Sequence, residues 1–219
     1  MKNGRKAAEM LGSAAVGYGL GIFNPAYVIG KKNGYDIREM GSKNAGASNT
    51  LIVEGKKSAA VVMATDIGKA ALAVELSKKL FPDCEYAEET AGTAAILGHM
   101  FPVTMSFRGG KGLACLGGTI MALGLKDFAV MLGLELGVLV CTKYICLVPI
   151  TASLFYPVYH GIMKRDWRGG AILGAVVPPI ILKHRENLRR IAEGKEFRIN
   201  FLWDREGELQ RTGWLEEMN

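Results

Sequence analysis

The 219-residue sequence contains only four cysteines, and no two of them form a C-x-x-C pair. This scarcity favours buried, reduced thiols over a disulfide framework or a cysteine-based metal site. We also expect no cleavable signal peptide, because the apolar run behind the basic N-terminus is too long and leads directly into a polar motif. The sequence has no Walker A spacing and no repeat in the range of roughly 20–50 residues.

Acidic residues are in the minority, with 21 Asp and Glu against 27 Lys and Arg, a net charge of +6 and an isoelectric point near 9.1. A nucleic-acid partner requires a basic stripe on a soluble surface. The cations here adjoin apolar segments instead, so we expect no nucleic-acid partner. Anionic lipid and anionic small molecules remain compatible with this charge, and no feature predicts a protein partner.

Apolar residues make up 49% of the chain, and they gather between residues 7 and 182. A helix that crosses a bilayer needs roughly 20 mainly apolar residues. Runs that approach this requirement cover residues 7–29, 57–81, 91–107, 113–140, 144–163 and 170–182. The run 113–140 is too long for one crossing and is interrupted at Lys126 and Asp127. We therefore expect an all-α integral membrane protein with about seven transmembrane helices.

Lysine and arginine are unevenly distributed between the two sides of this arrangement. Most of them fall in the first, third and fifth loops and in the segment that follows residue 182. Cytoplasmic loops are enriched in these residues. We therefore expect the N-terminus outside the cell and the C-terminus in the cytoplasm.

Three polar segments stand out against the apolar background: GSKNAGASN at residues 41–49, SFRGGKGLA at 106–114 and HRENLRR at 184–190. The expected topology places all three at the cytoplasmic interface. Their convergence predicts a pocket for a phosphorylated, water-soluble molecule at the edge of the bilayer.

The segment 41–49 supplies a hydroxyl from Ser42 and amides from Asn44 and Asn49. Its glycines allow close backbone approach to a ligand, and its polar side chains can hydrogen-bond that ligand. An ordinary turn with a helix N-cap at Ser48 or Asn49 is the alternative explanation.

In the segment 106–114, Lys111 lies among Gly109, Gly110 and Gly112, with Arg108 just before them. Successive backbone N–H groups and a lysine ammonium can together hold a phosphate. A basic cytoplasmic loop is the alternative explanation for the same cations.

His184 and Asn187 are three residues apart, so they share one face of a helix. Histidine exchanges protons near neutral pH, although an exposed basic helix end explains the segment equally well. Within the second apolar run, Asp66 and Lys69 have the same spacing and are as consistent with a structural ion pair as with a catalytic role. His99 ends the third run, where it either orients the glycine-rich loop or caps the helix.

Together the motifs resemble those of the bacterial acyl-phosphate:glycerol-3-phosphate acyltransferases, the PlsY family. The stretch GYDIREMGSKNAGASNT is similar to that family's D-I-R-x-x-G-S-G-N-x-G-A-T-N, and GHMFPVTMSFRGGKGLA to G-H-x-F-P-V-x-x-x-F-K-G-G-K-G-V-A. HRENLRRIAEGKE is similar to H-R-E-N-I-R-R-L-x-x-G-x-E. We therefore expect residues 1–198 to form the membrane acyltransferase domain and residues 199–219 a cytoplasmic C-terminal extension.

The resemblance implies transfer of an acyl group from acyl phosphate to the 1-hydroxyl of glycerol 3-phosphate, giving lysophosphatidic acid for phospholipid synthesis. It places this reaction at the cytoplasmic face of a bacterial inner membrane. It implies no metal and no cofactor, only the two substrates and the bilayer. The sequence has no Ser-His-Asp set and no H-x-x-x-x-D motif, which agrees with an acyl donor that is already activated.

The resemblance also assigns roles to single residues. Ser42 and the loop 109–112 with its lysine would hold phosphate. His184 and Asn187 would lie at the acceptor, and Glu186 would be mainly structural.

Two positions depart from the family pattern. Ile52 stands where the family usually has arginine, and Lys43 stands where it has glycine. A permanently charged, forked guanidinium is therefore missing from the first motif, and Lys43 can replace it only as a point charge. These departures leave two alternatives open: a paralogue that acylates another phosphorylated acceptor, and a non-enzymatic membrane binder or transporter of organic phosphate.

Overall fold

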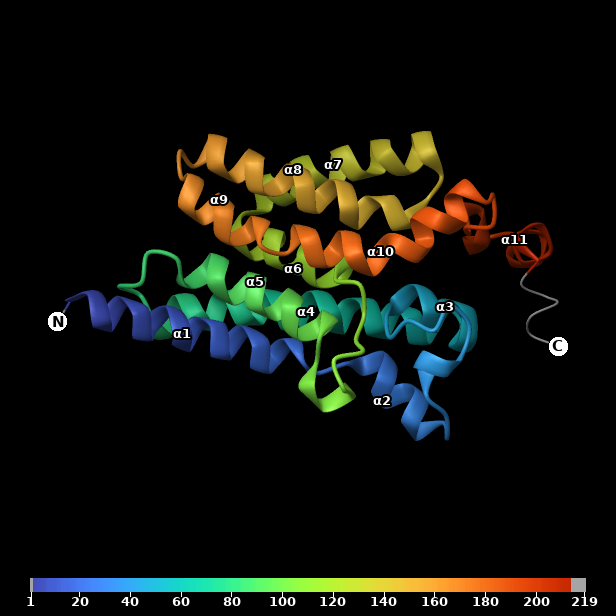
Figure 1. Ribbon diagram of the computed structural model, residues 1–219, viewed down its shortest axis with the longest axis horizontal. Helices are drawn as coiled ribbons and strands as arrows, with labels where there is room; N and C mark the ends of the chain where they lie inside the picture. The colour runs from blue at the N-terminus through green and yellow to red at the C-terminus, as the bar shows by residue number, and fades with distance from the viewer. Residues whose placement is uncertain (1, 214–219) are drawn as a thin grey trace.

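The computed structural model describes residues 2–213, and every regular element in that part of the chain is helical. Two groups of helices pack side by side, with the start of α1 at one end of the long axis and α11 at the other (Figure 1). The first group comprises α1 (Lys2–Gly21), α4 (Lys56–Leu80), α5 (Ala87–Met100) and α6 (Leu113–Leu123). The second comprises α7 (Leu125–Thr142), α8 (Val148–Met163), α9 (Trp167–Gly174) and α10 (Val177–Ala192).

Shorter elements gather toward the α11 end and in the connecting loops. They are α2 (Pro25–Lys32), α3 (Ala47–Glu54), α11 (Arg205–Thr212), η1 (Ile37–Glu39), η2 (Val103–Met105), η3 (Ile145–Leu147) and η4 (Ile199–Leu202).

The apolar run 7–29 forms two helices rather than one. Pro25 begins α2 because a proline lacks the N–H that would continue α1. Asn24 caps α2 by accepting a hydrogen bond from the backbone N–H of Tyr27 at 2.8 Å. Its amide also donates to the carbonyl of Ala45 at 3.0 Å, which ties α2 to the first motif.

The run 170–182 also divides, between α9 and α10, and this division matters for the site. Helix α10 continues without interruption from Val177 to Ala192, so it carries both apolar residues and the whole HRENLRR motif. The run 113–140 forms two helices as expected, joined at Gly124 rather than at Lys126 and Asp127.

Close packing of small residues joins α1 to α5. A methyl group added at Gly17 would meet the backbone of Ala91, so only glycine permits the observed approach. The largest buried cluster draws on both helix groups and includes Ala70, Ile96, Met100, Cys115, Leu116, Tyr156 and Ile180.

All four cysteines are free, in agreement with the expected reduced thiols. Cys84 and Cys115 are buried and Cys146 is partly buried, but Cys141 is exposed on α7. The expectation of burial therefore fails for Cys141.

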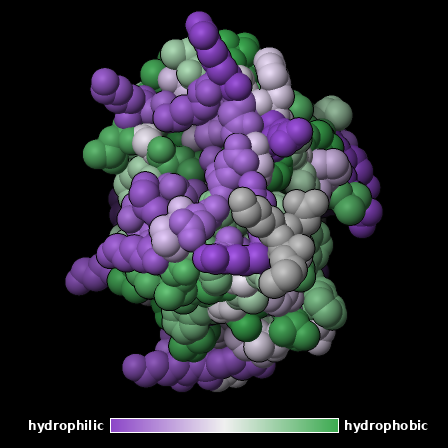
Figure 2. Space-filling model, turned by 90° about the vertical axis from the view of Figure 1, so that its left-hand side faces the viewer, coloured by the Kyte–Doolittle hydropathy of each residue, from purple (hydrophilic) through white to green (hydrophobic). Residues whose placement is uncertain are grey.

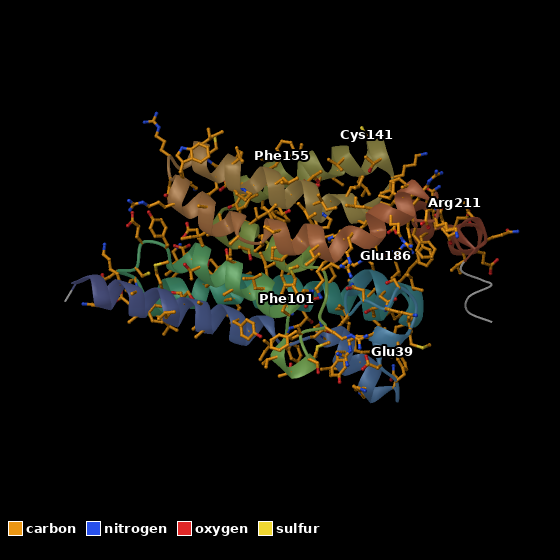
Figure 3. All side chains as sticks on the ribbon, in the orientation of Figure 1. Glu39, Phe101, Cys141, Phe155, Glu186 and Arg211 are labelled. Atoms are coloured by element: carbon orange, nitrogen blue, oxygen red, sulfur yellow. The ribbon has the colours of Figure 1, made fainter. Side chains whose placement is uncertain are left out.

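The outer faces of α7 and α8 are apolar. Large exposed side chains there include Val130, Leu132, Leu136, Val140, Leu154, Phe155, Val158 and Ile162. Figure 3 labels Cys141 and Phe155 on these two helices. In contrast, the end of the molecule near the start of α1 has hydrophilic side chains across its middle (Figure 2). Soluble monomers seldom expose so much contiguous apolar surface, so these faces suit a lipid environment.

Among the described residues, one helical segment is long and apolar enough to cross a bilayer by itself, Ile145–Met163. Leu113–Leu123 is a shorter apolar helix. The other expected crossings are interrupted by turns or carry charged residues, so the number of crossings stays a prediction.

Candidate substrate-binding site

A cavity of about 230 Å³ opens where the three polar segments meet. Six of its ten lining residues are cationic and one is acidic. The lining residues are Arg38, Ser42, Lys43, Asn44, Arg108, Gly109, Lys111, Lys183, Glu186 and Arg190. The structure thus brings together residues from all three motifs, and the cavity's charge suits an anion.

Asn49 lies outside this cavity although we expected it to bind substrate. It is fully buried, and its amide oxygen accepts the backbone N–H of Ser42 at 2.7 Å. Its amide nitrogen donates to the carbonyls of Ile37 and Met40 at 2.9 and 3.0 Å. Asn49 therefore shapes the loop that presents Ser42 to the cavity.

Arg38 joins the first motif to the glycine-rich loop. Its guanidinium donates two hydrogen bonds to Asp36, at 2.9 and 2.7 Å, and a third to the carbonyl of Met105 at 2.7 Å. It also lies 4.8 Å from the ring centroid of Tyr27. Hydrogen bonds from Arg38 hold the pKa of Asp36 well below its usual range, so this pair stays charged.

The glycine-rich loop is held by the protein rather than open to a ligand. The N–H of Gly109 donates to Met100 at 3.2 Å and that of Gly110 to the carbonyl of His99 at 3.1 Å. A Cβ on Gly110 would clash with Nε2 of the His99 ring and would lie 2.9 Å from the Ala45 carbonyl oxygen. Of the three glycines expected to bind phosphate, only Gly109 lines the cavity. Gly110 lies against His99, and Gly112, at φ +93°, caps α6.

Asp66, Lys69 and His99 form a buried network directly behind this loop. The Lys69 ammonium lies 2.7 Å from Asp66, 3.0 Å from Nδ1 of His99 and 2.5 Å from the carbonyl of Phe23. The ammonium neutralises the carboxylate and fixes the histidine ring that packs against Gly110. This placement supports the structural ion pair and the orienting role of His99.

Lys111 enters the cavity from the loop and meets Asn187 of α10. Its ammonium donates a hydrogen bond to the amide oxygen of Asn187, whose nitrogen donates to Glu196 at 2.6 Å. Arg190 donates to the other oxygen of Glu196 at 2.7 Å. Burial lowers the pKa of Lys111 to about 8, with a further lowering from the Arg190 charge.

His184 is buried and does not line the cavity itself. Its Nδ1 lies 2.8 Å from the carbonyl of Ile180. Because a carbonyl only accepts, this contact requires the proton on Nδ1 and leaves Nε2 unprotonated in the neutral ring. His184 is therefore in the tautomer that can accept a proton through Nε2.

Glu186 is on the cavity rim, where it pairs with Arg189 at 2.9 Å. Figure 3 shows it on α10. Its ion pair fits the mainly structural role that we expected.

The sequence reasoning did not select Arg38, Lys183, Arg190 or Glu196. Three of them lie inside the recognised motifs, and Lys183 directly precedes the third. Helical spacing held a usable signal, because residues 183, 187 and 190 recur at the intervals that place side chains on one face. Glu196 follows the end of the helix, and its contact with Asn187 depends on the turn between them.

The fold and the cavity together define a class of protein: a helical protein with lipid-compatible outer faces and a cationic site for a phosphorylated molecule. Known proteins make this class specific. The model of the family described as glycerol-3-phosphate acyltransferase matches residues 11–194.

Curated relatives carry the same description. The glycerol-3-phosphate acyltransferase of Thermoanaerobacter sp. (strain X514) is 35% identical over 188 residues, covering 85% of this chain and 94% of the relative. That of Symbiobacterium thermophilum is 36% identical over 194 residues, covering 88% and 96%.

A solved structure is also similar. The glycerol 3-phosphate form of PlsY (YgiH), described as an integral membrane glycerol 3-phosphate acyltransferase, matches with a TM-score of 0.77 and 31% identity, covering 88% of this chain and 96% of that one. Its lysophosphatidic acid form matches with a TM-score of 0.73 and 30% identity.

The chain therefore belongs to the glycerol-3-phosphate acyltransferase family of integral membrane enzymes. The predictions of family, enzyme class, acyltransferase activity in phospholipid synthesis and an all-α membrane fold are confirmed. The non-enzymatic alternative loses its support. The C-terminal extension lies outside the matched residues.

Proposed function

We propose that this enzyme takes its acyl group from acyl phosphate and delivers it to the 1-hydroxyl of glycerol 3-phosphate. The observation that carries the proposal is the cavity at the meeting point of the three motifs, where six cations face one carboxylate. Both proposed substrates are anionic, and both reactants must occupy neighbouring positions. A concentrated positive field attracts them and offsets their mutual repulsion.

Lys111, Arg190 and Ser42 are placed to bind the phosphate of glycerol 3-phosphate. Arg190 has a fixed guanidinium, because Glu196 accepts from its Nε. This guanidinium can perform the forked recognition that the family pattern assigns to the position of Ile52. Lys43 and Arg108, both exposed on the rim, add charge that draws the donor phosphate in.

The proposed reaction is a direct acyl transfer. The 1-hydroxyl oxygen attacks the carbonyl carbon of acyl phosphate, the new ester bond forms, and the carbonyl–phosphate bond breaks to release inorganic phosphate. The hydroxyl proton passes to Nε2 of His184 or to a substrate phosphate. Cations at the leaving phosphate stabilise the charge that develops there, and orientation of two bound substrates supplies a large part of the rate.

We propose a bacterial inner-membrane location with the active site at the cytoplasmic face, about seven crossings and an external N-terminus. The lysine and arginine bias toward the cavity side of the chain supports this orientation. The apolar faces of α7 and α8 support lipid contact. The acyl chain of the donor can lie in the bilayer while its phosphate enters the cavity.

Reconstitution tests the proposal. Purified protein in lipid vesicles receives palmitoyl phosphate and glycerol 3-phosphate, and lysophosphatidic acid and inorganic phosphate are measured together. Equal amounts of both products are expected. Product from palmitoyl coenzyme A but not from palmitoyl phosphate would overturn the donor assignment. Product only with another phosphorylated acceptor would favour the paralogue alternative.

A further inference from the structure

The described part of the C-terminal extension, residues 199–213, packs against α3 and against the turn at residues 194–196, next to the cavity. It contains η4 and α11 and lies beyond the residues that match the family model. The backbone N–H of Ile199 donates to the carbonyl of Lys143 at 2.8 Å, which ties the extension to the turn between α7 and η3.

Ile52 is the apolar anchor for this extension. It is 7% exposed and clusters with Phe201 and Leu209, which are 8% and 4% exposed. On its other side, Ile52 lies close to Gly41, where an added Cβ would meet Ile52 at 3.3 Å. One side chain therefore contacts both the first motif and the extension.

A hollow beside this cluster shows how closely position 52 adjoins the extension. It measures about 450 Å³ and is lined by both the α3–α4 junction and the extension. Burying a guanidinium against Phe201 and Leu209 would strand its charge among apolar side chains. The two departures from the family pattern, Ile52 and the extension, are therefore complementary parts of one contact.

Arg211 is the polar anchor. Its guanidinium donates to the carbonyl of Gly194 at 2.8 Å and to the carbonyl of Glu196 at 2.6 Å. It also pairs with Glu208 at 2.6 Å, and Glu208 accepts the N–H of Arg198 at 3.0 Å. Figure 3 labels Arg211 beside α11, near the end of α10.

The carboxylate of Glu208 stays charged in this setting. Burial acts to raise its pKa, but the hydrogen bonds from Arg211 and the Arg198 backbone hold it below the usual value. The ion pair between Glu208 and Arg211 thus persists at neutral pH and fixes the guanidinium over the turn at residues 194–196.

The turn at residues 194–196, which Arg211 holds by hydrogen bonds, contains Glu196, and Glu196 positions two residues beside the cavity. Glu196 accepts from Asn187 at 2.6 Å and from Arg190 at 2.7 Å, and Asn187 accepts from Lys111. Arg211 holds the backbone of Glu196, so it limits where the Glu196 carboxylate can lie. This chain of contacts runs from the extension to the cavity without a gap.

We propose that residues 199–213 form an intramolecular brace across the active site, in which Ile52 anchors the extension to the first motif and Arg211 positions Glu196, and through it Asn187 and Arg190. Arg211 is a positioning residue and touches no substrate. The proposal rests on the proposed function of the cavity. It assigns to Ile52 a role different from that of the arginine it replaces.

Replacing Arg211 is the first test, with Arg5→Ala as the matched control. Arg5 also pairs with two carboxylates, Glu9 at 2.8 Å and Asp83 at 3.0 Å, but far from the cavity. For Arg211→Ala we expect kcat/KM for glycerol 3-phosphate to fall about fivefold, because misplaced binding groups lose effective orientation. The Arg5→Ala enzyme should retain the parent value. Equal losses in both variants would overturn the proposal.

The pH profile separates positioning from simple destabilisation. The Glu196 charge raises the pKa of Lys111, so loosening Glu196 should move the alkaline limb of kcat/KM toward neutral pH. A variant that only contains less folded enzyme keeps the parent profile at reduced amplitude. An unmoved limb in Arg211→Ala would contradict the proposal. Of the other groups that face Lys111, Lys183, His184 and Cys146 keep their surroundings in that variant, whereas Arg190 is held by Glu196 and moves with it.

Ile52→Arg gives the sharpest contrast. A missing family arginine predicts that restoring it raises kcat/KM for glycerol 3-phosphate. The brace predicts a fall of about fivefold or more, because a buried charge expels Phe201 and frees the extension. Ile52→Leu, which preserves the apolar contact, should stay near the parent value. A gain of activity in Ile52→Arg would overturn the proposal.

Phe201→Ala covers the event that Ile52→Arg fails to fold, since Phe201 lies outside the family domain. It should reproduce the Arg211→Ala pH shift. In the double variant Phe201→Ala/Arg211→Ala, the loss of kcat/KM should be smaller than the product of the two single losses. Fully multiplicative losses would contradict a common brace.

Isothermal titration with glycerol 3-phosphate keeps this test separate from the acyl donor. Weaker binding in Arg211→Ala, with no change in Arg5→Ala, supports the brace even if palmitoyl phosphate proves to be the wrong donor. Unchanged glycerol 3-phosphate affinity in Arg211→Ala, together with an unmoved alkaline limb of kcat/KM, would overturn the proposal.

Discussion

The two walls of the cavity are held in different ways. The glycine-rich loop is held by two backbone hydrogen bonds and by steric exclusion, because its backbone packs against His99 and Ala45 with no room for one more carbon. The α10 wall is held by attraction, through the hydrogen bonds of Glu196 to Asn187 and Arg190. The loop and all its supports lie within residues 11–194, which match the family model. Glu196 ends the third motif just beyond them, and its support from Arg211 lies in the extension.

This difference predicts how each wall fails. A wall held by exclusion tolerates the loss of a distant charge but not an added atom. A wall held by hydrogen bonds tolerates small changes of volume but not the loss of a partner, since a buried polar group left unpaired is costly. Substitutions of opposite kinds should therefore break the two walls.

The largest effect is expected from Gly110→Ala. The added methyl group displaces either the loop or the His99 ring, and a shift of about 1 Å in a positioned group can cost about 100-fold in rate. We expect kcat/KM to fall about 100-fold in the reconstituted assay. Gly137→Ala is the control, because a Cβ at Gly137 meets nothing within 4 Å. A Gly110→Ala enzyme with near-parent activity would mean that the loop is not held by exclusion.

Lys111→Ala removes the loop's contribution to the other wall. Losing a desolvated charge from a bound phosphate costs about 2 kcal/mol or more, which corresponds to a roughly thirtyfold rise in KM for glycerol 3-phosphate. Initial-rate kinetics over a wide acceptor range measures this. Lys126→Ala, which removes an exposed lysine in the first turn of α7, should leave KM unchanged. A pure kcat effect would place Lys111 at the reacting centre instead.

Glu196→Gln tests the attractive wall by changing charge with almost no change in volume. A single acceptor oxygen then remains for two donors, Arg190 and Asn187, and Arg190 loses the nearer of its two carboxylate partners. We expect kcat/KM to fall about tenfold, because hydrogen bonds to charged groups are worth about 1.5–3 kcal/mol. Glu193→Gln, an exposed residue on the same segment, is the control. Parent-like kinetics would show that the α10 wall is rigid without Glu196.

The pH dependence should come from the contact between the walls. Lys111 has a pKa of about 8, so it is charged below that pH and becomes neutral above it. Phosphate affinity should therefore fall as the pH rises, and kcat/KM should drop about fourfold between about pH 7 and pH 8.5. Lys111→Arg stays charged throughout this range and should lose the alkaline limb. A limb that persists in Lys111→Arg would assign it to another group.

Lys43→Gly should have the smallest effect on activity of these variants. It should weaken activity slightly and raise the stability of the fold. Lys43 has a φ of +56°, a conformation that costs a residue with a side chain about 1 kcal/mol and glycine almost nothing. It is exposed on the rim, so its charge is worth less than about 1 kcal/mol. We expect KM to rise about twofold while the thermal unfolding temperature rises. Lower thermal stability would show that the lysine makes a favourable contact.

The comparison between walls also shows what the sequence could reveal. The loop wall could be predicted from the sequence, since the motif GGKG indicates both tight packing and a cation. Lys183, Asn187 and Arg190 were accessible in principle from helical spacing. Gly109 lines the cavity as expected, but the backbone N–H groups of Gly109 and Gly110 face the protein, and a sequence does not tell whether such groups face a ligand or the protein. Here they bond to His99 and Met100.

The fates of Asn49 and Ile52 depended on partners that lie elsewhere in the chain. Asn49 belongs to a polar motif, yet its amide nitrogen donates its hydrogen bonds to the backbone carbonyls of Ile37 and Met40 rather than to a ligand. From the sequence alone, Ile52 indicates only that the family's arginine is missing. The structure adds that Ile52 packs against Phe201 and Leu209. Local patterns identify which residues are unusual, but tertiary contacts decide what each one does.

Helix α10 carries apolar residues and the polar HRENLRR motif in one continuous helix. Leu182 is an exposed apolar residue, and Asn187 follows five positions later beside Lys111. At about 1.5 Å of rise per residue, these side chains are separated by about 7.5 Å along the axis. In the proposed reaction, a few residues of this helix therefore set the distance between the lipid-facing surface and the acceptor site. An insertion or deletion between them would change this spacing and would also turn Asn187 and Arg190 about the helix axis by about 100° per residue.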